Sequence, residues 1–151
     1  MMASLDDFRR GFTTASAAAT RALAKQFAEL VPPDTVLALH GDLGVGKTTF
    51  VQGLAHGFGI QDLVTSPTFN IYTVHSPRPG SAPGGRTLVH VDAYRLEHPR
   101  QLEALLIEDF LITPWCMAVE WPENVAAWLP PSAWHLELGI VDGERHTLRL
   151  R

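Results

Sequence analysis

Apolar runs of strand length alternate along the chain with stretches of helical spacing. An Ala-rich stretch predicts a first helix, which should end near Val31 because two prolines follow it. An apolar strand is predicted over residues 35–40, and a helical pattern follows from about Lys47 to Phe58. This order of helix, strand and helix is typical of an α/β protein.

The second half of the chain predicts more strands than helices. Strands over residues 70–75 and 87–91 flank residues 76–86, which are too rich in Pro and Gly for regular structure and predict a hairpin loop. A proline at the first helical position favours a helix over residues 99–110. A further buried strand is predicted over residues 116–119.

The last segment of the chain predicts a β-hairpin. Residues 134–140 and 145–150 alternate apolar and polar side chains around Asp142-Gly143, a turn sequence that hairpins favour. Residues 1–151 suit a single domain, which is long enough to bury a core. The elements together predict an α/β sandwich around a mixed, mainly parallel sheet with a C-terminal antiparallel hairpin.

Composition is that of a soluble globular protein. The 151 residues are 46% hydrophobic and 19% charged, and no apolar run approaches the roughly 18 residues of a membrane span. The first residues show no basic segment before an apolar core, so we expect no secretory leader. The single cysteine, Cys116, lies in an apolar run and is expected to be a buried thiol. Since no internal disulfide can form, we expect a cytoplasmic protein.

The charge balance argues against unaided binding of nucleic acid. The formal net charge is −4, and only two of the twelve basic residues are lysines. Proteins that hold a nucleic-acid backbone normally use a basic face. We therefore expect no DNA partner, and any RNA would be held by a partner protein. The seven histidines lack the paired spacing that is typical of zinc sites.

Residues 41–48 form the most specific pattern in the chain. They read Gly-Asp-Leu-Gly-Val-Gly-Lys-Thr, a complete G-x-x-x-x-G-K-[ST] phosphate-binding loop between a predicted strand and a predicted helix. The glycines let backbone amides approach phosphate oxygens at a helix N-terminus, where the helix dipole also favours negative charge. The expected nucleotide contacts are Gly41, Asp42, Leu43, Gly44, Val45, Gly46, Lys47, Thr48 and Thr49.

Two side chains of this loop have chemical roles of their own. Lys47 would reach the β- and γ-phosphates, and the Thr48 hydroxyl would bind Mg²⁺. The loop and its context predict a nucleoside triphosphate site in a three-layer sandwich of the P-loop NTPase kind.

Two acidic residues follow predicted strands, as a magnesium–nucleotide site requires. Asp92 ends one strand and Glu120 ends another. In open α/β sheets, ligands bind beyond the carboxyl ends of the strands, so both acids are placed to approach one Mg²⁺·nucleotide. The alternative for each is an acid on a surface turn, and position alone leaves that alternative open.

Four motifs in one order and spacing resemble a known family. They are the loop 41–50, Ser-Pro-Thr-Phe at 66–69, His-x-Asp-x-Tyr-Arg-Leu at 90–96 and Val-Glu-Trp-Pro at 119–122. Together they closely resemble the TsaE family, formerly YjeE, of bacterial ATPases required for threonylcarbamoyladenosine modification of tRNA. The resemblance covers roughly residues 14–150.

The resemblance implies an ATPase that works with the TsaB and TsaD proteins, of which TsaD transfers threonylcarbamoyl to adenosine. It also implies that Thr48 and Glu120 bind Mg²⁺. Asp92 and the segment 65–69, which includes Thr68, would act as switch-like elements at the γ-phosphate.

Three further residues match positions of the family. Thr20 matches a threonine near the nucleotide base, and Trp121 matches an aromatic residue close to the nucleotide, although a core or partner-facing tryptophan is equally compatible with the sequence. His90 is expected to orient the Asp92 loop rather than to act as a base.

The chain departs from the family pattern at three positions. Val45 replaces a more usual Ala, and Leu106 stands where many members have Gly, so we expect a difference in local packing there. The family's Gly-Arg pair near the C-terminus is interrupted before Arg145, which puts a nucleotide contact by this arginine in doubt.

The mechanism expected from these residues is slow hydrolysis. Lys47 would neutralise phosphate charge, Asp92 would position the attacking water, and Thr68 would close over the γ-phosphate. Arg95 is the nearest candidate for an arginine finger by motif, although a structural or partner-binding role fits it equally well. We therefore expect acceleration by partners that order the 65–69 and 90–96 segments.

Three other functions remain as alternatives. A small P-loop metabolite kinase would need an acceptor pocket and an arginine-rich lid, whereas the arginines here are scattered. A GTP-driven switch normally has an Asn-Lys-x-Asp motif, which is absent from the sequence. A nucleotide sensor without hydrolysis would require Asp92 and Glu120 both to be idle.

Overall fold

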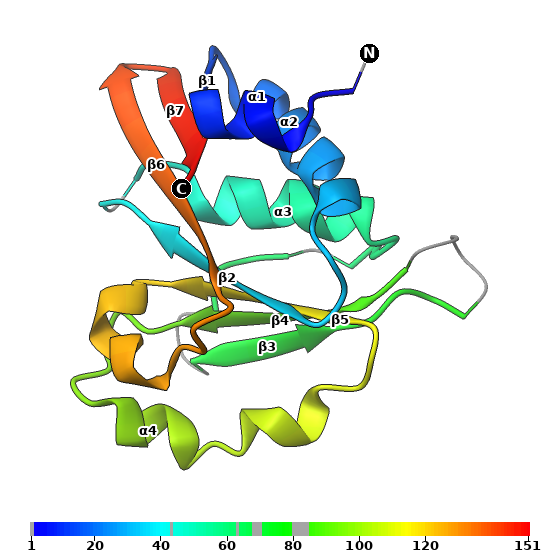
Figure 1. The fold of residues 1–151 in the computed structure, drawn as a ribbon, viewed down its shortest axis with the longest axis vertical. Coiled ribbons are helices and arrows are strands. Elements are labelled where there is room, and N and C mark those ends of the chain that lie inside the picture. Colours follow the sequence, from blue (N-terminus) through cyan, green and yellow to red (C-terminus); the bar gives the residue numbers. More distant parts are fainter. Residues whose placement is uncertain (1, 43, 63, 68–70, 80–84) are drawn as a thin grey trace.

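The computed structural model describes residues 2–42, 44–62, 64–67, 71–79 and 85–151, and the seven strands within these ranges form one sheet (Figure 1). The strand order is β1-β7-β6-β2-β5-β4-β3. The strands are β1 (Phe12–Thr14), β2 (Thr35–His40), β3 (Tyr72–His75), β4 (Thr87–Asp92), β5 (Trp115–Glu120), β6 (Trp134–Asp142) and β7 (Arg145–Leu150). The helices are α1 (Leu5–Arg10), α2 (Ala17–Leu30), α3 (Lys47–Gly57), α4 (Pro99–Glu103) and the 3₁₀ segments η1 (Ile107–Phe110) and η2 (Pro122–Trp128).

The sheet is parallel at its centre and antiparallel at both edges. Strands β6, β2, β5 and β4 are parallel neighbours, while β1 pairs with β7, β7 with β6 and β3 with β4 in antiparallel fashion. Residues 35–39 of β2 are all buried, because helices or turns cover both faces of the central strands. The mixed α/β sheet and its C-terminal antiparallel hairpin confirm the architecture predicted from the sequence.

Helices α1, α2 and α3 form a layer on one face of the sheet (Figure 1). Phe27 of α2 and Phe50 of α3 belong to one buried cluster with Leu37 of β2. The two long helices approach each other closely where α3 carries Gly53, since a Cβ there would lie 2.7 Å from the Cβ of Ala24. The close approach holds α3 against α2, and the buried cluster that they share with Leu37 packs both helices on the sheet.

The opposite face is covered by shorter elements: α4, η1 and η2. Side chains that alternate with those of the first layer, such as Val89 of β4 and Val119 of β5, point to this side. They form a second buried cluster with Leu102, Ile107 and Val125. The sheet therefore lies between two layers, as expected for a three-layer sandwich.

The helix predicted over residues 99–110 is wrong in its extent. It ends at Glu103, and a separate 3₁₀ turn begins at Ile107. The break occurs at Leu106, whose φ of 52° lies in the left-handed region, which a continuous right-handed helix cannot include. Leu106 therefore occupies a backbone conformation that suits glycine.

Two elements at the start of the chain were not predicted. α1 begins with a capping box in which Ser4 accepts a hydrogen bond from the Asp7 amide, and the Asp7 carboxylate accepts one from the Ser4 amide. β1 extends the sheet beside β7. Both elements are short, so hydrophobic periodicity gave no indication of them.

The predicted hairpin loop 76–86 joins β3 and β4, which pair antiparallel as a hairpin requires. Residues 80–84 lie outside the described part of the chain. The strand expected over 70–75 begins at Tyr72, with Asn70 also outside the described part. Among the described residues, no helix combines the length and apolar character needed to cross a membrane.

Candidate functional site

The phosphate-binding loop connects β2 to α3 at the carboxyl end of the sheet. Gly46 is the N-cap of α3 with a φ of 93°, and no side chain of the described residues caps the helix start. The first backbone amides of α3 therefore have no intrahelical or side-chain acceptor, as an anion site at a helix N-terminus requires. A Cβ on Gly41 would lie 2.6 Å from the Leu138 carbonyl oxygen, so this end of the loop fits tightly against β6.

Lys47 lies inside the loop and is only 5% exposed. Its Nζ donates a hydrogen bond of 2.6 Å to the Gly41 carbonyl oxygen and lies 3.7 Å from the centroid of the Trp121 ring. Burial lowers the pKa of Lys47, and the nearby carboxylates, Glu120 foremost, act in the opposite direction. The ammonium group is thus poorly hydrated and held over an aromatic face.

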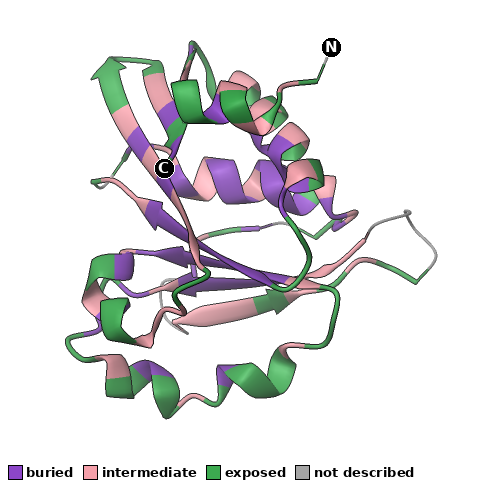
Figure 2. Cartoon of the chain, in the orientation of Figure 1, coloured by how far each residue is buried: buried purple, intermediate pink, exposed green. Residues whose placement is uncertain are grey.

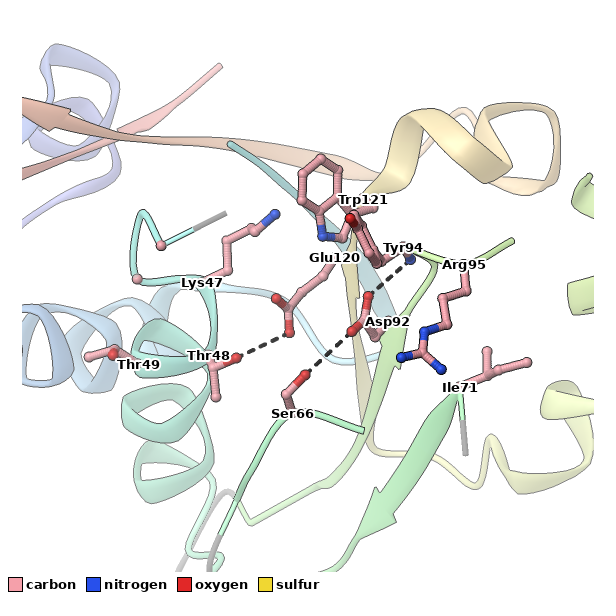
Figure 3. Close-up of a pocket in the computed structure, with 12 residues that line it drawn as sticks. Lys47, Thr48, Thr49, Ser66, Ile71, Asp92, Tyr94, Arg95, Glu120 and Trp121 are labelled. Atoms are coloured by element: carbon pink, nitrogen blue, oxygen red, sulfur yellow. Dashed lines mark hydrogen bonds between the residues drawn. The ribbon is translucent and has the colours of Figure 1, made fainter. Parts of the chain in front are cut away.

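Glu120 lies at the end of β5, opposite Thr48 of α3 (Figure 3). The Thr48 hydroxyl is 3.5 Å from Glu120 Oε2. The same oxygen is 2.5 Å from Nε2 of His90, a fully buried residue of β4. The structure therefore brings together the two residues predicted to bind Mg²⁺. His90 contacts Glu120, whereas the sequence had suggested that it orients the Asp92 loop.

Asp92 ends β4 and is the register partner of Glu120 across β4 and β5. Its carboxylate accepts hydrogen bonds from the Tyr94 amide at 3.0 Å and from the Ser66 hydroxyl at 3.3 Å. The Ala93 amide donates to the Glu120 carbonyl oxygen at 3.0 Å, which ties the two strand ends together. The Ser66 contact links the predicted switch segment 65–69 to Asp92.

A cavity of about 490 Å³ opens between the loop and these strand ends (Figure 3). Its walls combine the start of α3, the strand-end acids and an aromatic pair, Tyr94 and Trp121, whose ring centroids are 5.0 Å apart. The residues that line it are Gly44, Gly46, Lys47, Thr48, Thr49, Ser66, Ile71, Asp92, Tyr94, Arg95, Glu120 and Trp121.

Most of the residues predicted from the sequence line this cavity, but some do not. Gly41, Asp42 and Val45 belong to the loop without lining it. Thr20 is buried away from the cavity wall and shares a hydrogen bond of 2.7 Å with Thr14, so its contact with a nucleotide base stays a prediction. The predicted residues Leu43 and Thr68 lie outside the described part of the chain.

Sequence reasoning gave no role to two of the residues that line the cavity. The structure also shows the position of Arg145, whose contact with a nucleotide was in doubt. Ile71 and Tyr94 line the cavity: Ile71 lies outside the four motifs, and Tyr94 belongs to the motif at 90–96 but was given no role. Trp121 was expected near the nucleotide, and its φ of 57° marks a strained backbone at the cavity edge. Arg145 forms an exposed ion pair with Asp142 at the hairpin turn, with an Nε–Oδ1 distance of 3.1 Å.

The comparison with protein families identifies the chain. Residues 14–147 match the model of the family described as "Threonylcarbamoyl adenosine biosynthesis protein TsaE". The chain belongs to the TsaE family. This assignment confirms the resemblance found in the four sequence motifs.

Curated TsaE proteins from several bacteria are similar over most of the chain. The protein "tRNA threonylcarbamoyladenosine biosynthesis protein TsaE" of Treponema pallidum is 36% identical over 77% of this chain and 82% of its own. The TsaE of Streptomyces coelicolor is 42% identical over 69% of this chain and 68% of its own. The TsaE of Bacillus subtilis is 39% identical over 74% of this chain, which spans 65% of that relative's length.

A solved structure shares the fold. The crystal structure of Bacillus subtilis YdiB superimposes with a TM-score of 0.71 and is 28% identical, covering 93% of this chain and 82% of the other. The TsaE-family fold of this chain is thus supported by sequence and by structure.

Proposed function

We propose that this chain is a Mg²⁺-dependent ATP-binding protein and a slow ATPase that acts in threonylcarbamoyladenosine biosynthesis on tRNA. The observation that carries the proposal is the meeting of two groups in one cavity. The phosphate-loop residues Lys47 and Thr48 lie on one side, and the strand-end acids Asp92 and Glu120 lie on the other. Membership of the TsaE family supports the biosynthetic role.

The phosphate tail would bind at the start of α3. Gly46, Lys47 and Thr48 line the cavity there, no side chain among the described residues caps the helix, and the helix dipole favours an anion. The Lys47 ammonium would exchange the Gly41 carbonyl oxygen for phosphate oxygens, which form stronger charge-assisted hydrogen bonds. Its weak hydration on the Trp121 ring lowers the cost of that exchange.

The residues present fit a Mg²⁺ ion beside the phosphates. A hydroxyl and a carboxylate, Thr48 and Glu120, approach each other within 3.5 Å at the cavity wall, and both are oxygen ligands that Mg²⁺ prefers. Two protein oxygens are sufficient, since phosphates and waters complete the octahedral shell of a nucleotide-bound Mg²⁺. When bound, the ion would neutralise charge on the β- and γ-phosphate oxygens.

Asp92 is the residue proposed to position the attacking water. Its carboxylate lies in the cavity wall, held by the Tyr94 amide and the Ser66 hydroxyl. Thr68 is proposed to close over the γ-phosphate. Arg95 lines the cavity and is the nearest candidate for an arginine finger, but a structural or partner-binding role fits it equally well, so slow hydrolysis by the isolated protein is expected.

Partner proteins TsaB and TsaD are proposed to accelerate hydrolysis by ordering the 65–69 and 90–96 segments. Coupling of ATP turnover to this pair fits the net charge of −4, which favours contact with tRNA through partners rather than directly. We place the protein in the cytoplasm, where a free buried thiol such as Cys116 stays reduced.

The test compares binding and turnover of ATP in four proteins: wild type, Lys47→Ala, Glu120→Gln and Asp92→Asn. Lys47→Ala should weaken ATP binding by about 100-fold, because it removes a buried charge-assisted contact. Glu120→Gln should weaken the Mg²⁺ dependence, whereas Asp92→Asn should keep binding and lose turnover. The matched control is Lys25→Ala, which removes the exposed second lysine from α2 and should change neither quantity.

Two outcomes would contradict the proposal. ATP binding and turnover by Lys47→Ala at wild-type levels would exclude the loop as the nucleotide site. Equal hydrolysis rates with and without TsaB and TsaD at saturating ATP would exclude the coupling. Competition of GTP against bound ATP tests the choice of base in the same assay.

A further inference from the structure

His90 lies beneath the candidate site, in the middle of β4. It is fully buried, and its register partner on β5 is Ala118, two residues before Glu120 on the same face of the sheet. Its Nε2 is 2.5 Å from Glu120 Oε2, whereas its Nδ1 is buried without a hydrogen-bond partner among the described residues. The imidazole therefore makes one side-chain hydrogen bond, and that bond goes to the proposed magnesium ligand.

The unpartnered nitrogen has an energetic consequence. A buried polar atom without a partner costs about 1–3 kcal/mol, so an apolar side chain of similar shape would suit this strand position at least as well for stability alone. Leu88, two residues earlier on the same face of β4, is apolar and fully buried, which shows that this face of the strand accommodates such side chains. Packing thus gives no reason for a histidine at position 90.

The direction of the single hydrogen bond follows from its acceptor. A carboxylate oxygen accepts, so the hydrogen of the pair lies on Nε2 of His90. The bond engages Oε2 of Glu120, and the Thr48 hydroxyl approaches the same oxygen at 3.5 Å. No recorded hydrogen bond within the described chain involves the other oxygen, Oε1.

We propose that His90 is a positioning residue for Glu120. Its Nε2–H holds Oε2, the oxygen that the Thr48 hydroxyl approaches, and so fixes the orientation in which the carboxylate meets the divalent cation beside Thr48. A glutamate side chain has three rotatable bonds, and the buried donor removes their freedom before the cation arrives. Carboxylates that bind metals are commonly oriented in this way, and loss of the orienting partner costs 10- to 100-fold in affinity.

This inference rests on the proposed function, and its test separates the two. AMP-PNP, a non-hydrolysable ATP analogue, is bound to wild type, His90→Leu, His90→Met and His90→Gln while MgCl₂ is titrated. A parallel titration of AMP-PNP is made in EDTA. Leu and Met remove the donor, whereas the Gln amide retains one.

We expect His90→Leu and His90→Met to raise the half-saturating MgCl₂ concentration by about 10- to 100-fold. AMP-PNP affinity in EDTA should change by less than about 2-fold, because His90 does not line the cavity. His90→Gln should recover much of the lost Mg²⁺ affinity. The control is His75→Leu on β3, a partly buried histidine without contact to Glu120, which should leave the Mg²⁺ titration unchanged.

Each other outcome counts against the positioning role. An unchanged Mg²⁺ requirement in a folded His90→Leu or His90→Met protein overturns it. Equal losses with and without Mg²⁺ would indicate a merely structural role and overturn it as well. A Gln variant as weak as Leu would exclude the hydrogen bond as the cause. If wild type itself bound AMP-PNP without Mg²⁺ dependence, the result would contradict the proposed Mg²⁺-dependent function, whatever the His90 variants did.

Discussion

On one face of the sheet, the α-helices α2 and α3 cover the strands with 14 and 11 residues; on the other face, the described α-helix, α4, has five residues and the 3₁₀ segment η2 has seven. The first layer buries large aromatic side chains such as Phe27 and Phe50, which are fully inaccessible. The second leaves Phe110 and Ile112 exposed at its edge, and Figure 2 shows α4 largely at the surface.

This difference separates the two halves of the candidate site. The phosphate loop runs directly into α3 and is fixed by the well-packed layer. The acids lie at strand ends whose following residues, Tyr94 and Trp121, lead into the thinner layer. Three of the four described non-glycine residues with positive φ, Ile71, Leu106 and Trp121, also lie on that side. The phosphate-binding loop is thus attached to the more densely packed layer, and the acid-bearing segments are attached to the part of the fold that has least packing to lose.

The prediction with the largest expected effect compares how readily each layer opens locally, measured by the reactivity of a thiol buried in it. Leu54 of α3 and Leu102 of α4 are both fully buried, so Leu54→Cys and Leu102→Cys, each in a Cys116→Ala background, are matched substitutions. We expect the thiol at position 102 to react with a thiol reagent about 100-fold faster, because the α4 layer opens without global unfolding. Equal rates would mean that both layers open as one cooperative unit.

A second test addresses the close contact between α2 and α3. Gly53→Ala places a Cβ 2.7 Å from the Ala24 Cβ and against the Arg21 backbone. The helices must separate, and we expect the free energy of unfolding in urea to fall by about 2 kcal/mol even after the better helix propensity of Ala. Gly143→Ala, where a Cβ meets nothing within 4 Å, is the control. Unchanged stability of Gly53→Ala would show that the packed layer is more tolerant than its geometry indicates.

The two layers also differ in how far they could be predicted. α2, β2 and α3 follow from local signals: apolar periodicity, proline breaks and the glycines of the loop. The break after Glu103 does not follow from apolar periodicity, and its one indication was the resemblance, in which many family members have Gly where Leu106 stands.

The candidate site shows the same division. The loop residues and the strand-end acids Asp92 and Glu120 could be found because motif and strand position identify them. The contact of His90 with Glu120 could not, since it depends on β4 lying beside β5 and on a register in which position 90 shares a face of the sheet with Glu120. Contacts between strands depend on the sheet order, which local patterns do not encode.

The packed layer makes a third prediction, on pH. Cys116 of β5 faces this layer, and burial raises the pKa of its thiol to about 12. In the unfolded chain this thiol has a pKa near its ordinary value of 9.0. The native state therefore keeps its full stability below about pH 9, and ionisation of the thiol lowers the free energy of unfolding as the pH rises from there toward 12. We expect wild type to lose on the order of 1 kcal/mol by about pH 10 relative to Cys116→Ala, measured by urea unfolding across pH. If the free energy of unfolding changed with pH by the same amount in both proteins, burial would not be suppressing ionisation of the Cys116 thiol.

The smallest expected effect concerns the thinner layer and runs in the opposite direction. Leu106 is 61% exposed and has a φ of 52°, so its side chain gains little from burial while its backbone is strained. Leu106→Gly relieves a strain of about 1–2 kcal/mol but adds freedom to the unfolded chain, which leaves a net gain of about 0.5–1 kcal/mol. The control is Leu105→Gly. Leu105 packs against the second buried cluster, so this variant should be less stable than wild type. If Leu106→Gly were also destabilised, this leucine would contribute packing to the α4 layer, and the contrast between the two faces would be smaller than the exposed fractions imply.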